Sequence, residues 1–289
     1  MSAVNATLPV KTQAAGRKKK RLLFRRLVLR SGAFIYLIGL LVIPLMVILY
    51  DGLREGLTGL WHQVSSPVAW HALKLSLWTA AVMTVINTVM GLLTAFVLVR
   101  YEFPGKKILN SVIDLPLAIP SLVTGVMLVV LYGPQQAVGA WLKQNLGLSI
   151  IFAPPGIILA LLFITYPFVI RAVQPVLVAL DRDQENAAAT LGASGWTIFS
   201  RIIFPSLRLP LITGALLSFA RGIGEFGAIV IVAGNIPLYS QTAAVYVLGE
   251  VESENRMGAS AVSIVMITIA LLATLSANYL HRRFWKVKP

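Results

Sequence analysis

Long apolar runs separated by short polar segments form the main pattern along this chain. Each run is close to the roughly 20 consecutive apolar residues that an α-helix needs to cross a bilayer. We therefore predict six transmembrane helices, at about 32–50, 71–99, 108–132, 155–177, 207–233 and 258–280. The fold class that this pattern predicts is all-α, in the form of a polytopic membrane protein.

Two of the connections between these runs are long enough to hold structure of their own. The connection at 133–154 contains Trp141 in a stretch compatible with a helix. The connection at 234–257 has an apolar middle that is too short to cross a bilayer. We predict a short helix there, which either dips back into the membrane or lies at its interface.

The composition agrees with a membrane protein. Hydrophobic residues make up 57% of the chain and charged residues 12%, and the mean hydropathy is +0.80. A soluble domain normally carries about twice that charged fraction. The chain has no cysteine, which excludes disulfides and thiolate chemistry. His62, His71 and His281 are scattered, so we expect interfacial or tail residues rather than metal ligands.

The formal net charge of +14 is better explained by membrane topology than by nucleic-acid binding, because basic residues gather at the ends of apolar runs. Residues 1–32 contain nine Lys or Arg and no Asp or Glu. We predict a basic cytoplasmic tail at 1–32, beside anionic lipid, in front of a membrane domain at 33–289; a targeting peptide is the alternative. The same bias predicts that the loops near 100–107 and 178–206 and both termini are cytoplasmic.

The cytoplasmic loop at 181–205 has the most distinctive sequence, DRDQENAAATLGASGWTIFSRIIFP. Residues 184–191 are good helix formers with acidic residues near the expected helix start. Gly192 and Gly195 predict a break, after which apolar residues recur at helical spacing until Pro205 interrupts the pattern. We predict two short helices at an angle, and an ordinary hairpin between two spans fits the composition equally well.

This loop resembles the EAA loop of ABC-transporter permeases, in which Glu-Ala-Ala is followed by a glycine and later by Ile-x-Leu-Pro. The chain departs from that pattern at Asn186, which stands where the motif has Glu, and at Phe204, which replaces Leu. The resemblance implies that the loop receives the motion of a partner ATPase. The residues to which it gives this coupling role are Glu185, Asn186, Ala187, Ala188, Leu191, Gly192, Ile202 and Pro205.

Ionisable residues within the predicted spans are candidates for the translocation path. Arg221 and Glu225 are four residues apart, on one face of a helix, and can neutralise each other. We predict either a role in transport or a structural ion pair. Asp114 precedes Pro116 and Pro120, and the prolines predict a kink or an opening in the third span, either as a packing feature or as a place to bind solute.

Motifs for enzyme chemistry are missing from the sequence. Gly222, Gly224 and Gly227 spell G-x-G-x-x-G, but no strand precedes them, so close helix packing explains them better. No P-loop, H-E-x-x-H or G-x-S-x-G occurs. The remaining enzyme hypothesis is a membrane-bound enzyme that uses Asp114 or Glu225 as a proton carrier. A scaffold whose basic tail binds anionic lipid is a third class.

Taken together, the chain resembles the type I importer permeases of the ABC class, with the MetI-like bundle, and more narrowly the sulfate/thiosulfate permease subunit of the CysT type. The stretches that carry this likeness include RYEFPGKKILNSVIDLPLAIPSLVTG and SFARGIGEFGAIVIVAGNIPL, and the likeness covers about 70–280. A permease for molybdate, tungstate or another oxyanion is the alternative.

The resemblance implies a set of partners in the bacterial cytoplasmic (inner) membrane. They are a second homologous permease subunit of the CysW type, two ATPase subunits of the CysA type that hold ATP and Mg, and an external sulfate/thiosulfate-binding protein. The chain itself is then no enzyme and binds no cofactor, no metal and no nucleic acid. Its surroundings are the lipid bilayer.

Overall fold

The computed structural model describes residues 28–286, and side chains as far as Arg282. Most of the predicted basic tail, residues 1–27, and the last residues, 287–289, lie outside the described residues. Within the described part every regular element is a helix, which confirms the predicted all-α class. The chain divides into two compact units, Met1–Tyr50 and Asp51–Pro289, which are described separately.

In its described part, the first unit is one long apolar helix. The helix begins at Val28, passes through a π-helical turn η1 (Ile38–Val42) and α2 (Ile43–Gly52), and ends two residues past the boundary between the units. Nearly every side chain along it is exposed, including large apolar ones such as Phe34 at 68%. An apolar helix of this length is typical of a membrane span.

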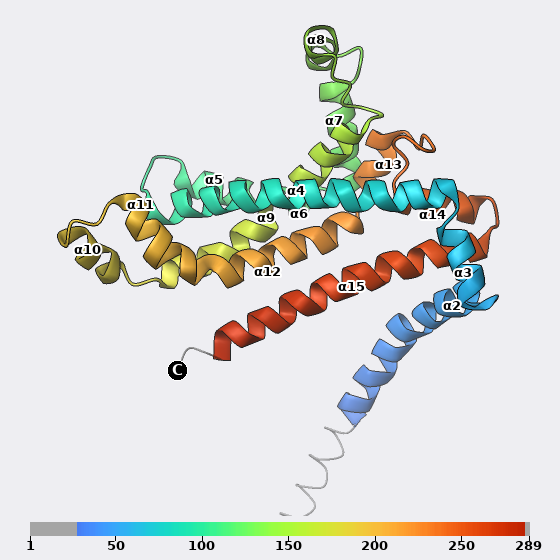
Figure 1. Cartoon of the computed structure of the whole chain (residues 1–289), viewed down its shortest axis with the longest axis horizontal. Helices are drawn as coiled ribbons and strands as arrows, with labels where there is room; N and C mark the ends of the chain where they lie inside the picture. The colour runs from blue at the N-terminus through green and yellow to red at the C-terminus, as the bar shows by residue number, and fades with distance from the viewer. Residues whose placement is uncertain (1–27, 287–289) are drawn as a thin grey trace, which may run out of the picture. The chain divides into compact units, whose positions relative to one another are not determined.

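Four long helices run lengthwise through the second unit (Figure 1). They are α4 (Pro67–Arg100), α9 (Pro154–Ala179), α12 (Phe204–Ile223) and α15 (Arg256–Lys286). α4 packs on α9 and α12, and α12 packs on α15. Each of the four belongs to a helix that is long and apolar enough to cross a membrane, as the sequence predicts.

Capping and small residues fix the start and the packing of α4. The Ser66 hydroxyl accepts a hydrogen bond from the Ala69 N–H at 3.4 Å, and proline follows the cap at the first helical position. Further along, a Cβ at Gly91 would lie 2.9 Å from Cβ of Val169 on α9. The two helices can therefore approach closely only because residue 91 is a glycine.

The third predicted span is broken, as its prolines predict. It consists of α5 (Lys106–Val112), α6 (Leu115–Ala118) and α7 (Ser121–Tyr132), with a bend of 107° between α6 and α7. Ile119, which precedes Pro120, is extended at ψ 129°, because a following proline disfavours the helical conformation. When the two segments on either side of this bend are counted as one span, the described residues contain six candidate spans.

The structure corrects two boundaries near the fifth predicted span. Pro205 does not interrupt the helix: α11 (Gly195–Ile198), the π-helical turn η2 (Phe199–Ile203) and α12 form one continuous 29-residue helix. Pro205 lies in the first turn of α12, directly after the π turn, where a missing N–H is tolerated. The span expected to continue to 233 ends instead at Ile223, and α13 (Gly227–Ala233) begins after a short break.

Short helices occupy both long connections. α8 (Ala137–Leu146) contains Trp141, and α14 (Ala243–Glu252) contains the apolar stretch that predicts a short helix. α14 packs against α15 and α4, and its Ala243 N–H donates to Ser76 Oγ at 2.8 Å. α10 (Arg182–Thr190) and α11 lie at one end of α4, and α14 lies at the opposite end (Figure 1).

Candidate coupling loop and translocation residues

The first helix of the 181–205 loop has a well-defined beginning and end. The Asp181 carboxylate accepts a hydrogen bond from the Asp183 N–H at 2.9 Å, so α10 begins at Arg182, slightly earlier than expected. At the other end the Ala193 N–H donates to the Ala188 carbonyl, and the Gly192 N–H to that of Ala189, both at 3.0 Å. This is a Schellman motif.

The Schellman motif explains the glycine at position 192. Gly192 has φ of 83°, in the left-handed region, where a residue with a Cβ is strained. The predicted break at Gly192 is therefore confirmed. Gly195, in contrast, has an ordinary φ and open space around it, and Ser194 caps the next helix by accepting from the Thr197 N–H at 3.2 Å.

Two large apolar side chains are exposed on this loop. Leu191 is 88% exposed and Trp196 is 74% exposed. The Trp196 ring stacks on the ring of Phe199, with 5.7 Å between centroids. Of the predicted coupling residues, those that are also exposed are Asn186, Ala187, Gly192 and Pro205. Exposed apolar side chains next to helix ends are typical of a surface that another protein covers.

Glu185, by contrast, points toward the rest of the second unit. Its carboxylate pairs with the guanidinium of Arg100 at the end of α4, and the two side chains are 18% and 9% exposed. Arg182 adds a hydrogen bond to the Val99 carbonyl at 3.2 Å. Ala188 and Ile202 are likewise half-buried. The predicted coupling set therefore divides into an outward and an inward part.

The predicted pair of Arg221 and Glu225 forms an ion pair with 2.7 Å between Nη2 and Oε2. The helix ends between the two residues, so Glu225 lies in the break between α12 and α13. Its carboxylate is 1% exposed and also accepts the Ala228 N–H at 3.0 Å. The Arg221 side chain is 39% exposed. The Glu225 carboxylate is thus buried, while the Arg221 side chain stays partly exposed.

Asp114 has a cationic partner that the sequence reasoning did not single out. Nε and Nη2 of Arg171 on α9 donate to the two carboxylate oxygens of Asp114, at 2.8 and 2.6 Å. The remaining donors of Arg171 bind the side-chain and backbone oxygens of Asn110 and the side chain of Gln174. Arg171 was detectable as an ionisable residue inside a predicted span. The geometry describes a clamp between α9 and the junction of α5 and α6 in the third span.

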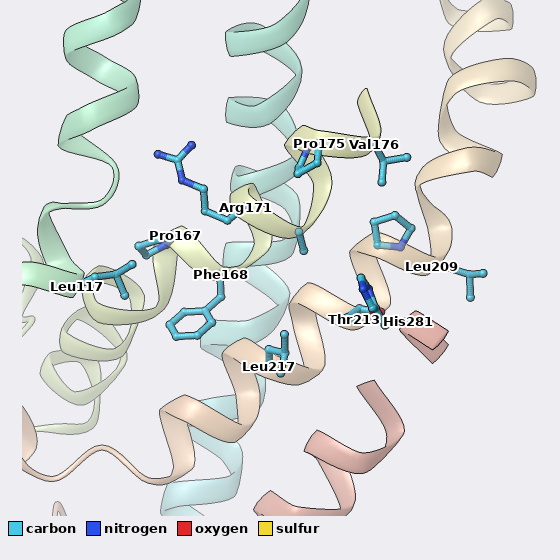
Figure 2. A pocket seen from close by; sticks show the side chains of 12 residues that line it. Leu117, Pro167, Phe168, Arg171, Pro175, Val176, Leu209, Thr213, Leu217 and His281 are labelled. Atoms are coloured by element: carbon cyan, nitrogen blue, oxygen red, sulfur yellow. The ribbon is translucent and has the colours of Figure 1, made fainter. Parts of the chain in front are cut away.

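A cavity of about 420 Å³ opens between α9 and α12 beside this clamp (Figure 2). Its lining is almost entirely apolar and includes Pro167, Phe168, Leu209 and Leu217. Figure 2 shows the guanidinium of Arg171 pointing away from the Thr213 side of the cavity. Because a dehydrated anion needs fixed donors or cations, this cavity is poorly suited to hold one.

Comparison with known proteins identifies the family. A family model described as "Binding-protein-dependent transport system inner membrane component" matches residues 87–286. This chain belongs to that family. A probable sulfate transport system permease protein, cysT, from Chlorokybus atmophyticus is 39% identical over 246 residues, which is 85% of this chain and 86% of the relative. The sulfate transport system permease protein CysT of Synechocystis sp. is 38% identical over 248 residues, with 86% of each covered.

Solved structures show the same fold. A chain of a bacterial alginate ABC transporter, crystallised with an alginate-bound periplasmic protein, superposes with a TM-score of 0.73 at 19% identity and covers 92% of this chain and 96% of that one. The MetNI methionine ABC transporter gives 0.51 at 17% identity, with 76% and 99% covered. These structures give the chain the MetI-like permease bundle, and the family match together with the permease relatives makes it a multi-pass transporter subunit rather than an enzyme. The family match begins inside α4.

Proposed function

We propose that this chain is the permease subunit of an ATP-driven sulfate/thiosulfate importer, and that it receives the ATPase stroke through the 181–205 loop. The observation that carries the proposal is the exposed apolar pair, Leu191 and Trp196, at the end of the bundle that holds α10. The substrate follows from relatives named as sulfate transport permeases, which match most of the chain.

In this proposal the exposed face of the loop docks on an ATPase subunit. Leu191 follows α10 directly and Trp196 lies in α11, so both can enter a groove of the partner together. ATP-driven closure then displaces α10, and the helices joined to it, α9 and α12, rock between inward and outward openings. The loop and both termini face the cytoplasm, where ATP is available.

The translocation path in this proposal includes Arg221. Sulfate carries a double negative charge, and its dehydration inside the membrane must be offset by cations or hydrogen-bond donors. Arg221 is held by Glu225 but is still 39% exposed, so it can meet an anion without losing its partner. Asp114 serves a different purpose, because both its oxygens are bound by Arg171. We assign it to the structure of the broken third span.

The proposed assembly holds a second permease of the CysW type, two ATPases of the CysA type that bind ATP and Mg, and an external binding protein that delivers sulfate or thiosulfate. Its place is the bacterial inner membrane. This chain contributes no cofactor site to the assembly. Within the described residues, no cluster of His, Cys, Asp or Glu has the geometry to hold a metal ion.

Reconstitution in liposomes tests the proposal. The chain is co-purified with its permease and ATPase partners, and ATP hydrolysis and [³⁵S]sulfate uptake are measured with and without sulfate-loaded binding protein. We expect the loaded binding protein to raise both rates and excess thiosulfate to compete. Competition by molybdate but not thiosulfate would reassign the substrate, and sulfate flux through the isolated chain without ATP would contradict the proposed role.

A further inference from the structure

Three contacts tie the 181–205 loop to the last turns of α4. The carboxylate of Glu185 pairs with Arg100, and Arg182 donates to the Val99 carbonyl. The ring of Phe199 meets the ring of Phe96 edge to face, with 5.9 Å between centroids. The contacts come from both halves of the loop, and α4 is separated from the loop in sequence by more than a whole span.

The backbone segments that connect α10 to α9 and to α11 are irregular. α9 ends at Ala179, and Leu180 and Asp181 are both extended, with ψ of 128° and 118°. On the other side the chain passes through Gly192 in the left-handed region and Ser194 at ψ 156°. Such connections absorb changes in φ and ψ, and so they transmit a displacement less directly than a contact between packed side chains.

α4 is well placed to carry a displacement onward. It packs on both α9 and α12, and Asn87 near its middle donates to Thr165 Oγ1 of α9 at 2.8 Å and to the Leu162 carbonyl at 3.2 Å. Asn87 is 1% exposed. A push on the end of α4 therefore reaches the centre of the bundle through buried contacts.

The Arg100–Glu185 pair is more buried than the Lys106–Glu102 pair, which lies on the segment that follows α4. The side chains of Arg100 and Glu185 are 9% and 18% exposed, so solvent screens them weakly. The Lys106–Glu102 pair has 2.7 Å between its charged atoms, but the Glu102 side chain is 87% exposed. The hydrogen bond and charge of Lys106, and to a smaller extent the charge of Arg182, lower the pKa of Glu102. The hydrogen-bond partner of Glu102 lies on its own surface segment, so Glu102→Gln removes a charge near α10 without breaking the Arg100–Glu185 pair and serves as the control.

We propose that Arg100 is a positioning residue that makes α10 and α4 move as one body, so that the stroke enters the bundle through α4 as well as through α9 and α12. This inference rests on the proposed function. It gives Glu185 an internal role, while the neighbouring exposed Asn186 and Leu191 remain on the docking surface.

The test uses the reconstituted transporter and the ratio of sulfate transported to ATP hydrolysed. We expect Arg100→Gln and Glu185→Gln to lower this ratio by at least about fivefold, the lower end of typical coupling between sites. Co-purification with the ATPase and its hydrolysis should persist. The exchanged double variant, Arg100→Glu with Glu185→Arg, should recover most of the ratio, and Glu102→Gln should leave it unchanged.

A covalent bridge gives a second measurement on the same pair. The chain has no native cysteine, so Arg100→Cys and Glu185→Cys can be joined by a short bismaleimide. We expect the unbridged double variant to be uncoupled and the bridged one to regain transport per ATP, because a fixed link preserves a joint motion. A bridged transporter that hydrolyses ATP without moving sulfate would show that α10 moves against α4, which overturns the inference.

The remaining outcomes are also decisive. An unchanged ratio of sulfate transported to ATP hydrolysed in the single variants overturns the inference. A parallel loss of assembly, hydrolysis and transport that the bridge does not reverse also overturns it, because the pair is then only structural. A wild-type assembly that hydrolyses ATP but moves no sulfate overturns the proposed function, and the inference with it.

Discussion

Replacing Arg221 by alanine leaves the Glu225 carboxylate enclosed without its cation. Glu225 is 1% exposed and retains the Ala228 N–H, whereas Arg221 is 39% exposed. The reverse change, Glu225→Gln, leaves a cation that reaches solvent and an amide oxygen that can still accept the Ala228 N–H. The two ends of the same ion pair should therefore respond differently to substitution.

The difference can be estimated from burial. Breaking a buried ion pair by removing one partner costs about 3–5 kcal/mol. We take the lower value, about 3 kcal/mol, for Arg221→Ala, because the Ala228 N–H continues to stabilise the carboxylate. For Glu225→Gln we expect about 1 kcal/mol, the contribution of an ordinary hydrogen bond. The difference of about 2 kcal/mol corresponds to roughly 4–8 °C in Tm for a chain of this size class.

Thermal unfolding in detergent measures this difference. The variants Arg221→Ala and Glu225→Gln are compared with Arg208→Ala, which removes an exposed cation that lies 5.6 Å from the Phe204 ring centroid. We expect the Tm of Arg221→Ala to be clearly the lowest and that of Arg208→Ala to stay near wild type. Equal shifts for Arg221→Ala and Glu225→Gln, or the reverse order, would refute the reasoning from burial.

Uptake separates a transport role from a structural one at the same position. We expect Arg221→Ala to lower sulfate uptake per assembled transporter more than it lowers assembly, because the cation facing the path is lost. Glu225→Gln keeps that cation and should retain more uptake. Equal fractional losses of assembly and uptake in Arg221→Ala would mean that the pair is structural.

Two further substitutions test the loop and the clamp. Gly192→Arg should abolish co-purification with the ATPase while membrane insertion persists, because it adds bulk beside Leu191 and about 1–2 kcal/mol of left-handed strain. The control is Gly195→Ala, since Gly195 has an ordinary φ and open space around it. Unchanged co-purification of Gly192→Arg would contradict the proposed docking surface. Arg171→Lys should lower the Tm measurably, because an ammonium cannot reproduce the two-pronged contact with Asp114; a Tm equal to wild type would show that charge alone suffices.

Features that depend on local chemistry could be predicted from the sequence. Apolar runs locate the spans because a bilayer accepts few other elements, and Gly192 marks a helix end because a left-handed residue is needed there. The break near Pro120 was predictable for the same kind of reason, since proline restricts the residue before it.

Other features depend on partners far away in the chain. Arg100 and Glu185 are 85 residues apart, and Asp114 and Arg171 are 57 apart, so no local pattern joins either pair. The continuation of the helix past Pro205 depends on the π turn just before it, which hydrophobic periodicity does not reveal. Tertiary packing, rather than propensity, decides these features.

Thiol labelling measures on which side of the membrane the 181–205 loop lies. A Leu191→Cys variant provides a single thiol in this chain, at a position that is 88% exposed. The control is Trp141→Cys on α8, at a position that is 56% exposed and is predicted to lie on the opposite side of the membrane. We expect a membrane-impermeant maleimide to label Trp141→Cys in intact cells, and to label Leu191→Cys only after permeabilisation and less when the ATPase is bound. Labelling of Leu191→Cys from outside intact cells would show that the 181–205 loop cannot receive the stroke of a cytoplasmic ATPase.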